Sequence, residues 1–139
     1  MVAAWGGRIR VLVVDDDPNF VEATTAMLGA DKRLEVVGAA FSGEEAVRQA
    51  RVLEPDVVAM DIVMPGLDGI EATRLIHDSR PDCQVVLVSG SIFREQGDQG
   101  EHAAHAAGAA AYVLKARAAL DLADVVAALK PRAAEAPPE

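Results

Sequence analysis

Several kinds of residue are scarce in this sequence of 139 residues, and each scarcity excludes a class of structure. Cys83 is the only cysteine, so neither an internal disulfide nor a cysteine-based zinc site can form. No apolar run approaches the roughly 20 residues that cross a bilayer, and the run Val11–Val14 leads into three aspartates rather than a leader cleavage site. We therefore expect a soluble, cytoplasmic protein with no membrane partner.

Positive charge is also in short supply. Thirteen lysines and arginines face 22 aspartates and glutamates, which gives a net charge of −9. Because a phosphate backbone is bound by clustered cations, we do not expect this chain to bind nucleic acid directly. Aromatic residues make up only 4% of the chain, but 51% is hydrophobic. That composition favours one globular domain built around an aliphatic core.

Short β-branched runs alternate with longer helical patterns along the chain. The predicted strands are Arg10–Val14, Glu35–Ala39, Val57–Met60, Gln84–Val88 and Ala111–Leu114. The predicted helices are Asn19–Leu28, Gly43–Leu53, Gly69–Asp78, Arg94–Ala107 and Ala118–Leu129. Five such units predict an α/β fold, a parallel sheet covered on both faces. We place one domain over 8–130, with an N-terminal extension over 1–7 and a disordered tail or linker over 131–139.

Local signals refine the ends of these elements. Ser42 precedes a helix and Glu45 follows three residues later, which is the pattern of a capping box. Asp17 is the candidate cap of the helix that begins at Pro18. The stretch Ser91–Gly100 carries two glycines and mixed charges, so we predict a loop there.

Polar residues stand where four of the predicted strands end. Asp15 and Asp16 follow the first strand, Asp61 the third, Ser89 the fourth and Lys115 the fifth. The carboxyl ends of parallel strands share one edge, where open α/β sheets bind ligands. Three neighbouring carboxylates need a cation, and Mg²⁺ is the ion best suited to such oxygen ligands. This combination matches the needs of phosphoryl transfer, with Asp61 as a nucleophile that forms an acyl phosphate.

Each of these residues also has an ordinary structural explanation. A single aspartate at a strand end is usually a turn residue or a helix cap. Ser89 alone would be structural, and Lys115 alone would be a surface lysine. The joint placement of the five groups is what favours a site.

Three segments carry a resemblance to a known family. They are Val11–Pro18 (VLVVDDDP), Pro55–Gly69 (PDVVAMDIVMPGLDG) and Gly108–Lys115 (GAAAYVLK). On these residues the chain resembles the receiver domain of bacterial response regulators. It is most similar to receivers that precede LuxR/NarL-type DNA-binding domains. The resemblance implies a CheY-like, flavodoxin-like doubly wound sheet of five parallel strands in the order 2-1-3-4-5.

The resemblance also implies a role for each site residue in two-component signalling. Asp61 would accept a phosphoryl group from a sensor histidine kinase. Asp16, Asp61 and the Val63 carbonyl would bind Mg²⁺, with Asp15 acting through water. Ser89 and Lys115 would hold the phosphoryl group, and Tyr112 would be the switch aromatic.

The same family implies how the signal leaves the domain. The fourth helix, fifth strand and fifth helix would form an output face, read by a second copy of the chain or by an effector domain absent from it. The parent protein would then control transcription. The chain itself would be a switch rather than an enzyme.

Three features depart from the family pattern. Ala116 stands where many receivers have proline, so a cis bond after Lys115 is not expected. The stretch from Ser89 to Lys115 is longer than usual, with Gly97 and Gly100 in the excess, which puts the start of the fourth helix in question. Val63 is apolar and cannot position a hydrolytic water, which predicts slow self-dephosphorylation.

Two other functions stay open at this point. Asp15 and Asp17 could form the D-x-D pair of a haloacid-dehalogenase-like phosphatase, although Asp61 would then have no role. Alternatively, the domain could bind proteins without ever taking a phosphoryl group.

Overall fold

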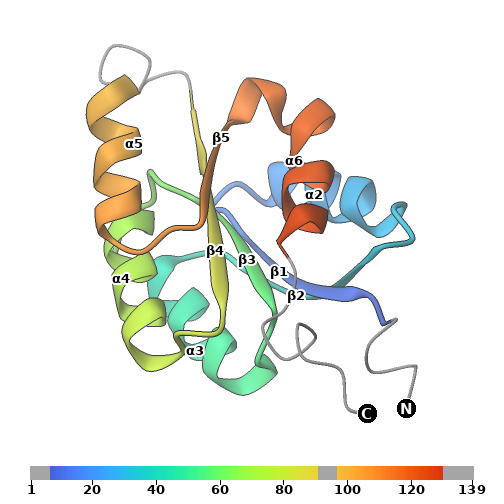
Figure 1. Cartoon of the computed structure of the whole chain (residues 1–139), viewed down its shortest axis with the longest axis horizontal. Coiled ribbons are helices and arrows are strands. Elements are labelled where there is room, and N and C mark those ends of the chain that lie inside the picture. Colours follow the sequence, from blue (N-terminus) through green and yellow to red (C-terminus); the bar gives the residue numbers. More distant parts are fainter. Residues whose placement is uncertain (1–6, 91–96, 130–139) are drawn as a thin grey trace.

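The computed structural model describes residues 7–90 and 97–129. Their elements run in the order β1 (Ile9–Val14), α2 (Pro18–Gly29), β2 (Leu34–Ala40), α3 (Gly43–Leu53), β3 (Val57–Asp61), α4 (Gly69–Ser79), β4 (Gln84–Ser89), α5 (Gly97–Ala106), β5 (Ala111–Leu114), η2 (Lys115–Arg117) and α6 (Ala118–Ala128). The strands form one parallel sheet in the order β2-β1-β3-β4-β5 (Figure 1). The predicted fold and strand order are therefore confirmed.

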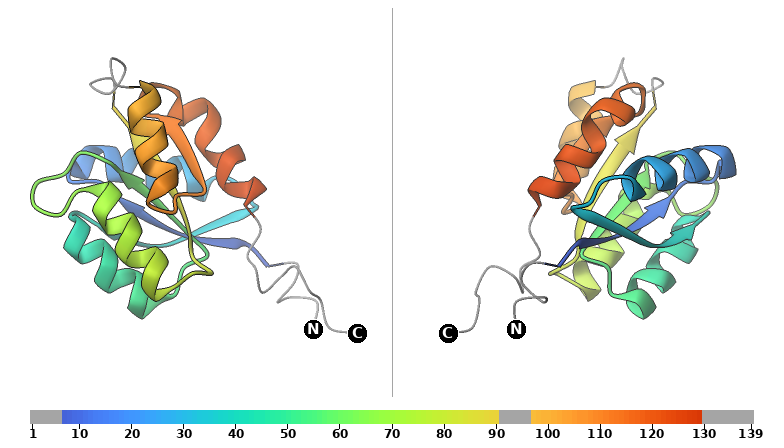
Figure 2. Two further views of the ribbon diagram at one scale, coloured as in Figure 1. Left: turned by 60° about the vertical axis from the view of Figure 1, so that its left-hand side comes forward. Right: turned by 90° about the vertical axis from the view of Figure 1, so that its right-hand side faces the viewer.

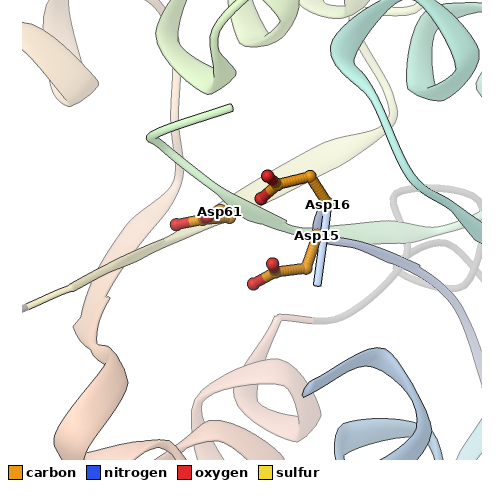
Figure 3. A group of neighbouring side chains, drawn as sticks. All are labelled: Asp15, Asp16 and Asp61. Carbon is orange, nitrogen blue, oxygen red and sulfur yellow. The ribbon is translucent and has the colours of Figure 1, made fainter. Parts of the chain in front are cut away.

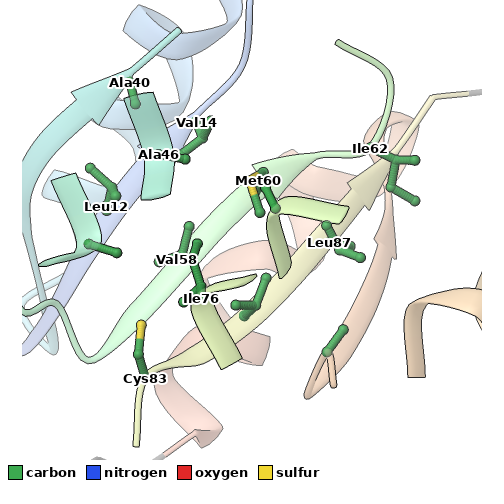
Figure 4. Packing of buried hydrophobic residues seen from close by; sticks show 14 of the residues in the cluster. Leu12, Val14, Ala40, Ala46, Val58, Met60, Ile62, Ile76, Cys83 and Leu87 are labelled. Carbon is green, nitrogen blue, oxygen red and sulfur yellow. The ribbon is translucent and has the colours of Figure 1, made fainter. Parts of the chain in front are cut away.

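Helices cover both faces of this sheet. The helices α3, α4 and α5 lie on one face, and α2 and α6 lie on the other (Figures 1 and 2). Side chains of a strand point to alternate faces, so each central strand serves two cores. In β3, Val58 and Met60 pack under α3 and α4, whereas Val57 and Ala59 face α2 and α6 (Figure 4). This is why β1, β3 and β4 are nearly continuous aliphatic runs.

Side-chain caps fix where three of the helices begin. The carboxylate of Asp17 accepts the Asn19 N–H at 3.0 Å, which confirms Asp17 as the cap of α2. Ser42 Oγ accepts the Glu45 N–H at 3.1 Å, while the Glu45 carboxylate turns back to the N–H of Phe41 rather than of Ser42. Asp68 caps α4 through the Glu71 N–H at 2.9 Å. In the described part of the chain, no helix could cross a membrane.

The predicted boundaries are correct to within one residue almost everywhere, and the exception is α5. Residues 97–100 are helical, which confirms the predicted helix over 94–107 at these residues and shows that the prediction of a loop as far as Gly100 is wrong for them. Glycine has a low helix propensity, which is why the two glycines favoured a loop. Further along α5, Ala104 is fully buried in the core. The predicted helix start at residues 94–96, most of the extension over 1–7 and the tail over 131–139 lie outside the described residues.

Candidate functional site

Three carboxylates meet at the carboxyl edge of the sheet. Asp15 and Asp16 follow β1, and Asp61 is the last residue of β3. One oxygen from each lies within 4.8 Å of the other two, and the three side chains converge on one space (Figure 3). Asp15 and Asp61 are buried, whereas Asp16 is exposed to solvent. We call these three residues the acidic cluster.

Backbone hydrogen bonds fix both strand ends that carry the cluster. The Asp15 N–H donates to the Ala40 carbonyl at 3.1 Å, and the Asp15 carboxylate accepts the Asp17 N–H at 2.9 Å. After Asp61, the Ile62 N–H donates to the Val88 carbonyl, while the Ile62 carbonyl accepts the Gly69 N–H at 2.8 Å. These two bonds fix the residue directly after Asp61 and hold the start of α4 against it.

Lys115 brings a positive charge to the cluster from the far side of β4. Its Nζ lies 2.9 Å from an Asp15 oxygen and 3.8 Å from an Asp61 oxygen. The side chain is only 28% exposed, and the same nitrogen lies 4.3 Å from the centre of the Phe20 ring. Burial works against the charge, but the hydrogen bond to Asp15 and the nearby carboxylates raise the pKa of Lys115 above its usual value.

The environment of Asp61 disfavours its negative charge. Burial, followed by repulsion from Asp15, raises the pKa of Asp61 to about 6; Lys115 and the Val63 amide act in the opposite direction, and Asp16 adds to the repulsion. Asp61 is only 6% exposed and lies next to a second buried carboxylate, so its negative charge is destabilised unless a cation is close by. Shifted pKa values of this kind are frequent at functional sites, so the shift marks Asp61 as a candidate functional group.

The donor set of the acidic cluster fits Mg²⁺. Magnesium prefers hard oxygen ligands, uses one or two carboxylates, and keeps several waters. Asp61 and Asp16 supply carboxylate oxygens within reach of one another, and the exposure of Asp16 leaves that side open to water. The chemistry of these residues suits a divalent cation that would compensate their mutual repulsion.

Ser89 lies on β4, the strand next to that of Asp61, and Tyr112 lies on β5, one strand further out. Ser89 ends β4 and is buried, and its hydroxyl donates to the Gly90 carbonyl at 3.1 Å rather than to the acidic cluster. Tyr112 in β5 pairs with Leu87 in the sheet and is partly buried against the core under α4 and α5. Among the residues described, nothing accepts or donates a hydrogen bond to its buried hydroxyl.

Each of the three departures from the family pattern follows the end of a strand. Val63 is 47% exposed just beyond Asp61. Ala116 lies inside the short turn η2, and the described part of the chain contains no cis peptide bond, as expected at this position. The lengthened stretch after Ser89 leads into α5, which begins at Gly97 within the described residues.

Sequence reasoning missed two residues that shape the site. Phe20 carries no polar group and reads as part of an ordinary amphipathic helix, so nothing in the pattern linked it to Lys115. Gly69 was noted only as a helix start, although its backbone presses against that of Asp61. The Asp68-Gly69 pair, at the end of the turn between the strand of Asp61 and the next helix, was the available signal.

The sequence profile of the response regulator receiver domain matches residues 11–127. The chain belongs to this family. The prediction made from three short segments is thereby confirmed, and the domain is a receiver of the kind that works in two-component signalling.

The similar sequences are longer regulators. The chain is 53% identical over 81 residues to the response regulator GacA from Pseudomonas viridiflava, which covers 58% of this chain and 38% of GacA. It is 39% identical over 120 residues to the transcriptional regulatory protein LiaR from Bacillus subtilis, covering 86% of this chain and 55% of LiaR. The chain spans between about a fifth and just over half of the length of these and other curated relatives that it matches.

Solved receiver structures have the same fold. The receiver of NarL from Mycobacterium tuberculosis is 28% identical, with a TM-score of 0.78 over 86% of this chain and 93% of that one. The receiver of Thermotoga maritima CheB is 34% identical, with a TM-score of 0.80 over 94% and 99%. CheY of Borrelia burgdorferi, solved in a complex with CheX, BeF₃ and Mg²⁺, is 28% identical, with a TM-score of 0.70 over 85% and 84%.

The structure and the family leave the phosphatase alternative without support. The D-x-D interpretation needs the carboxylates of both Asp15 and Asp17 at one reaction centre. The Asp17 carboxylate instead caps α2 through the Asn19 N–H, and the acidic cluster consists of Asp15, Asp16 and Asp61. Asp61, which the phosphatase interpretation leaves without a role, is a member of that cluster.

Proposed function

We propose that this receiver is a phosphorylation switch in which Asp61 accepts a phosphoryl group from the phosphohistidine of a sensor kinase. The observation that supports this most directly is that Asp61 lies close to two further carboxylates and one lysine at a single edge of the sheet. This set of groups supplies a nucleophile, ligands for a divalent cation, and a cation for the transferred group.

Transfer of the phosphoryl group would proceed as an in-line displacement. A carboxylate oxygen of Asp61 attacks phosphorus, the P–O bond forms while the P–N bond breaks, and the imidazole nitrogen of the donor histidine retains the electron pair and takes up a proton. Asp16, Asp61 and the Val63 carbonyl would hold Mg²⁺, with Asp15 acting through water. When bound, the ion neutralises charge on the transferring group.

The chain's own residues supply the remaining electrostatics. Lys115 already lies 3.8 Å from Asp61, close enough to pair with an oxygen of the phosphoryl group once it is attached. Ser89 would exchange its bond to the Gly90 carbonyl for one to the phosphoryl group. The solved CheY complex with BeF₃ and Mg²⁺ supports this arrangement, because beryllofluoride imitates a phosphoryl group and that protein has the same fold.

The added charge would then change the surface formed by α5, β5 and α6. Phosphorylation adds about −1.5 to −2 charge at one point, and the movement of Ser89 toward it would let Tyr112 settle further inward. Two pre-existing arrangements of the α5–β5–α6 face would shift in population. A second copy of this domain or an effector domain would read the result, since the relatives include a transcriptional regulator of which this chain spans 55%.

Incubation with acetyl phosphate and Mg²⁺ tests the proposal. Intact-mass spectrometry should show one phosphoryl adduct per chain in the wild type and none in Asp61→Asn. Catalytic release of phosphate that survives Asp61→Asn would instead indicate a phosphatase. No adduct under any condition, together with no response of α5 to beryllofluoride and Mg²⁺, would favour a binding module that works without phosphorylation.

A further inference from the structure

The side chain of Lys115 has an aromatic neighbour that belongs to a distant part of the chain. The Phe20 ring, in the first turn of α2, lies below the ammonium group, with 4.3 Å between Nζ and the ring centre. Phe20 is partly buried against the core that α2 shares with α6. The cap at Asp17 and the proline at the start of α2 fix the position of this turn. The ring is therefore a rigid support under a flexible lysine.

An aromatic face suits this position for a chemical reason. A lysine ammonium has three N–H donors, and here one oxygen of Asp15 lies 2.9 Å away. A ring attracts the cation through its quadrupole but takes no strong hydrogen bond from it. A second carboxylate at the place of Phe20 would compete for the remaining donors. The ring holds the charge near Asp61 while the other donors stay available.

From this contact we propose that Phe20 is a positioning residue for phosphoryl transfer: it holds the Lys115 ammonium beside Asp61 by a cation–π interaction. The inference rests on the proposed function, because it assigns Phe20 a part in that reaction. It predicts that the electron density of the ring, and not only its volume, sets the rate of phosphorylation. In this proposal Phe20 acts through Lys115, the one cation that its ring contacts within the described residues.

The competing explanation is that Phe20 only fills space at the end of the α2–α6 core. Such a role would respond to size and apolarity. It would not respond to fluorine atoms on the ring, which withdraw electron density with little change of shape. Phe41 offers a matched control, because it is an exposed phenylalanine on the turn that follows β2 and makes no contact with a cation within the described residues.

The test combines graded rings with two measurements. Mono-, di- and trifluorophenylalanine are placed at position 20, and the rate of Asp61 phosphorylation by acetyl phosphate with Mg²⁺ is measured together with the thermal midpoint of each protein. We expect the rate to fall stepwise with each fluorine, to about three- to tenfold below the wild type, at unchanged thermal stability. Phe20→Leu should be as slow as the trifluorinated protein, Phe20→Trp should retain the wild-type rate, and Phe41→Leu should not slow the reaction.

A spectroscopic measurement reads the contact without any phosphoryl donor. The ε-methylene protons of Lys115 should be shifted upfield by the ring current of Phe20, and Phe20→Leu should abolish that shift while Phe41→Leu leaves it. Equal rates across the fluorinated series, or the absence of the ring-current shift, would overturn the inference while leaving the switch intact. A wild type that takes no phosphoryl group would overturn the proposed function itself, and the role of Phe20 with it.

Discussion

The backbone of Gly69 packs directly against the carbonyl of Asp61. A Cβ at position 69 would collide with that carbonyl group and with the Cα of Ile62. The Gly69 N–H also donates to the Ile62 carbonyl at 2.8 Å, so α4 begins in direct contact with the strand end that carries the candidate phosphoacceptor. Any side chain at this position would push the start of α4 and the end of β3 apart.

Replacing Gly69 by alanine should therefore be costly. We expect Gly69→Ala to lower the free energy of unfolding by about 1–3 kcal/mol or more, because the obstacle is backbone and cannot rotate away. Gly29→Ala is the matched control: nothing lies within 4 Å of a Cβ at that helical position, and it should raise the free energy of unfolding by about 0.5–1 kcal/mol. Urea unfolding measures both variants. A neutral Gly69→Ala would contradict the close approach.

The pKa of Asp61 predicts an unusual pH dependence of stability. In the absence of divalent cations the folded pKa is about 6, above the ordinary value of 3.8. The folded protein therefore binds a proton that the unfolded chain has already lost, and stability falls as the pH rises from about 4 through 6. At pH 7.5, Asp61→Asn should be more stable than the wild type by up to about 3 kcal/mol.

The stability difference between Asp61→Asn and the wild type should be about 1 kcal/mol smaller at pH 5.5, because Asp61 is protonated in a large fraction of the folded wild-type molecules at that pH. Glu22→Gln serves as a control, since Glu22 is exposed on α2 and its replacement should change stability little at either pH. The measurement is urea unfolding in EDTA at the two pH values. Equal stabilities of Asp61→Asn and wild type at both would refute a destabilising carboxylate.

Neighbouring aspartates should differ sharply in their effect on magnesium affinity. Asp16 belongs to the acidic cluster, so Asp16→Asn should weaken Mg²⁺ binding by at least about tenfold. Asp17 caps α2 instead, and asparagine caps helices as well as aspartate does, so Asp17→Asn should leave the affinity nearly unchanged. Isothermal titration calorimetry compares the two. Equal losses would mean that net charge, not ligation, determines affinity.

The apolar side chain of Val63 should make the phosphorylated state long-lived. It is 47% exposed beyond Asp61 and offers no group to orient an attacking water. We expect a half-life of minutes or longer after removal of the phosphoryl donor, and a severalfold shorter one in Val63→Asn. Val52→Asn, at an exposed valine on α3, should not change it. A wild-type half-life of seconds would contradict this explanation.

The sequence was sufficient to predict which groups meet at the edge of the sheet. Asp61 and Lys115 each follow a buried aliphatic run, and parallel strands bring their ends to the same side whatever the details of helix packing. The 2-1-3-4-5 order came from the family resemblance, because alternation alone does not fix which strands are neighbours.

Contacts that depend on packing between distant elements could not be predicted in this way. Phe20 on α2 meets Lys115, which follows β5, because α2 and Val113 of β5 pack in the same core. At Gly97 and Gly100 the local signals conflicted, because the helical pattern predicted a helix over 94–107 whereas the glycines and mixed charges predicted a loop; the helix is what forms. The end of α3 was also not marked in the usual way. Glu54 has a left-handed backbone there, with φ 50°, a conformation that glycine most often adopts at helix ends.

Chemical trapping of the phosphorylated residue tests the central claim most directly. After reaction with acetyl phosphate and Mg²⁺, borohydride reduces an aspartyl phosphate to homoserine, and peptide mass spectrometry locates the change. We predict homoserine at position 61 alone, and none in protein treated without the phosphoryl donor. Homoserine at Asp15 or Asp16, or an unmodified Asp61 in protein that carries a phosphoryl group, would contradict the assignment of Asp61 as the phosphoacceptor.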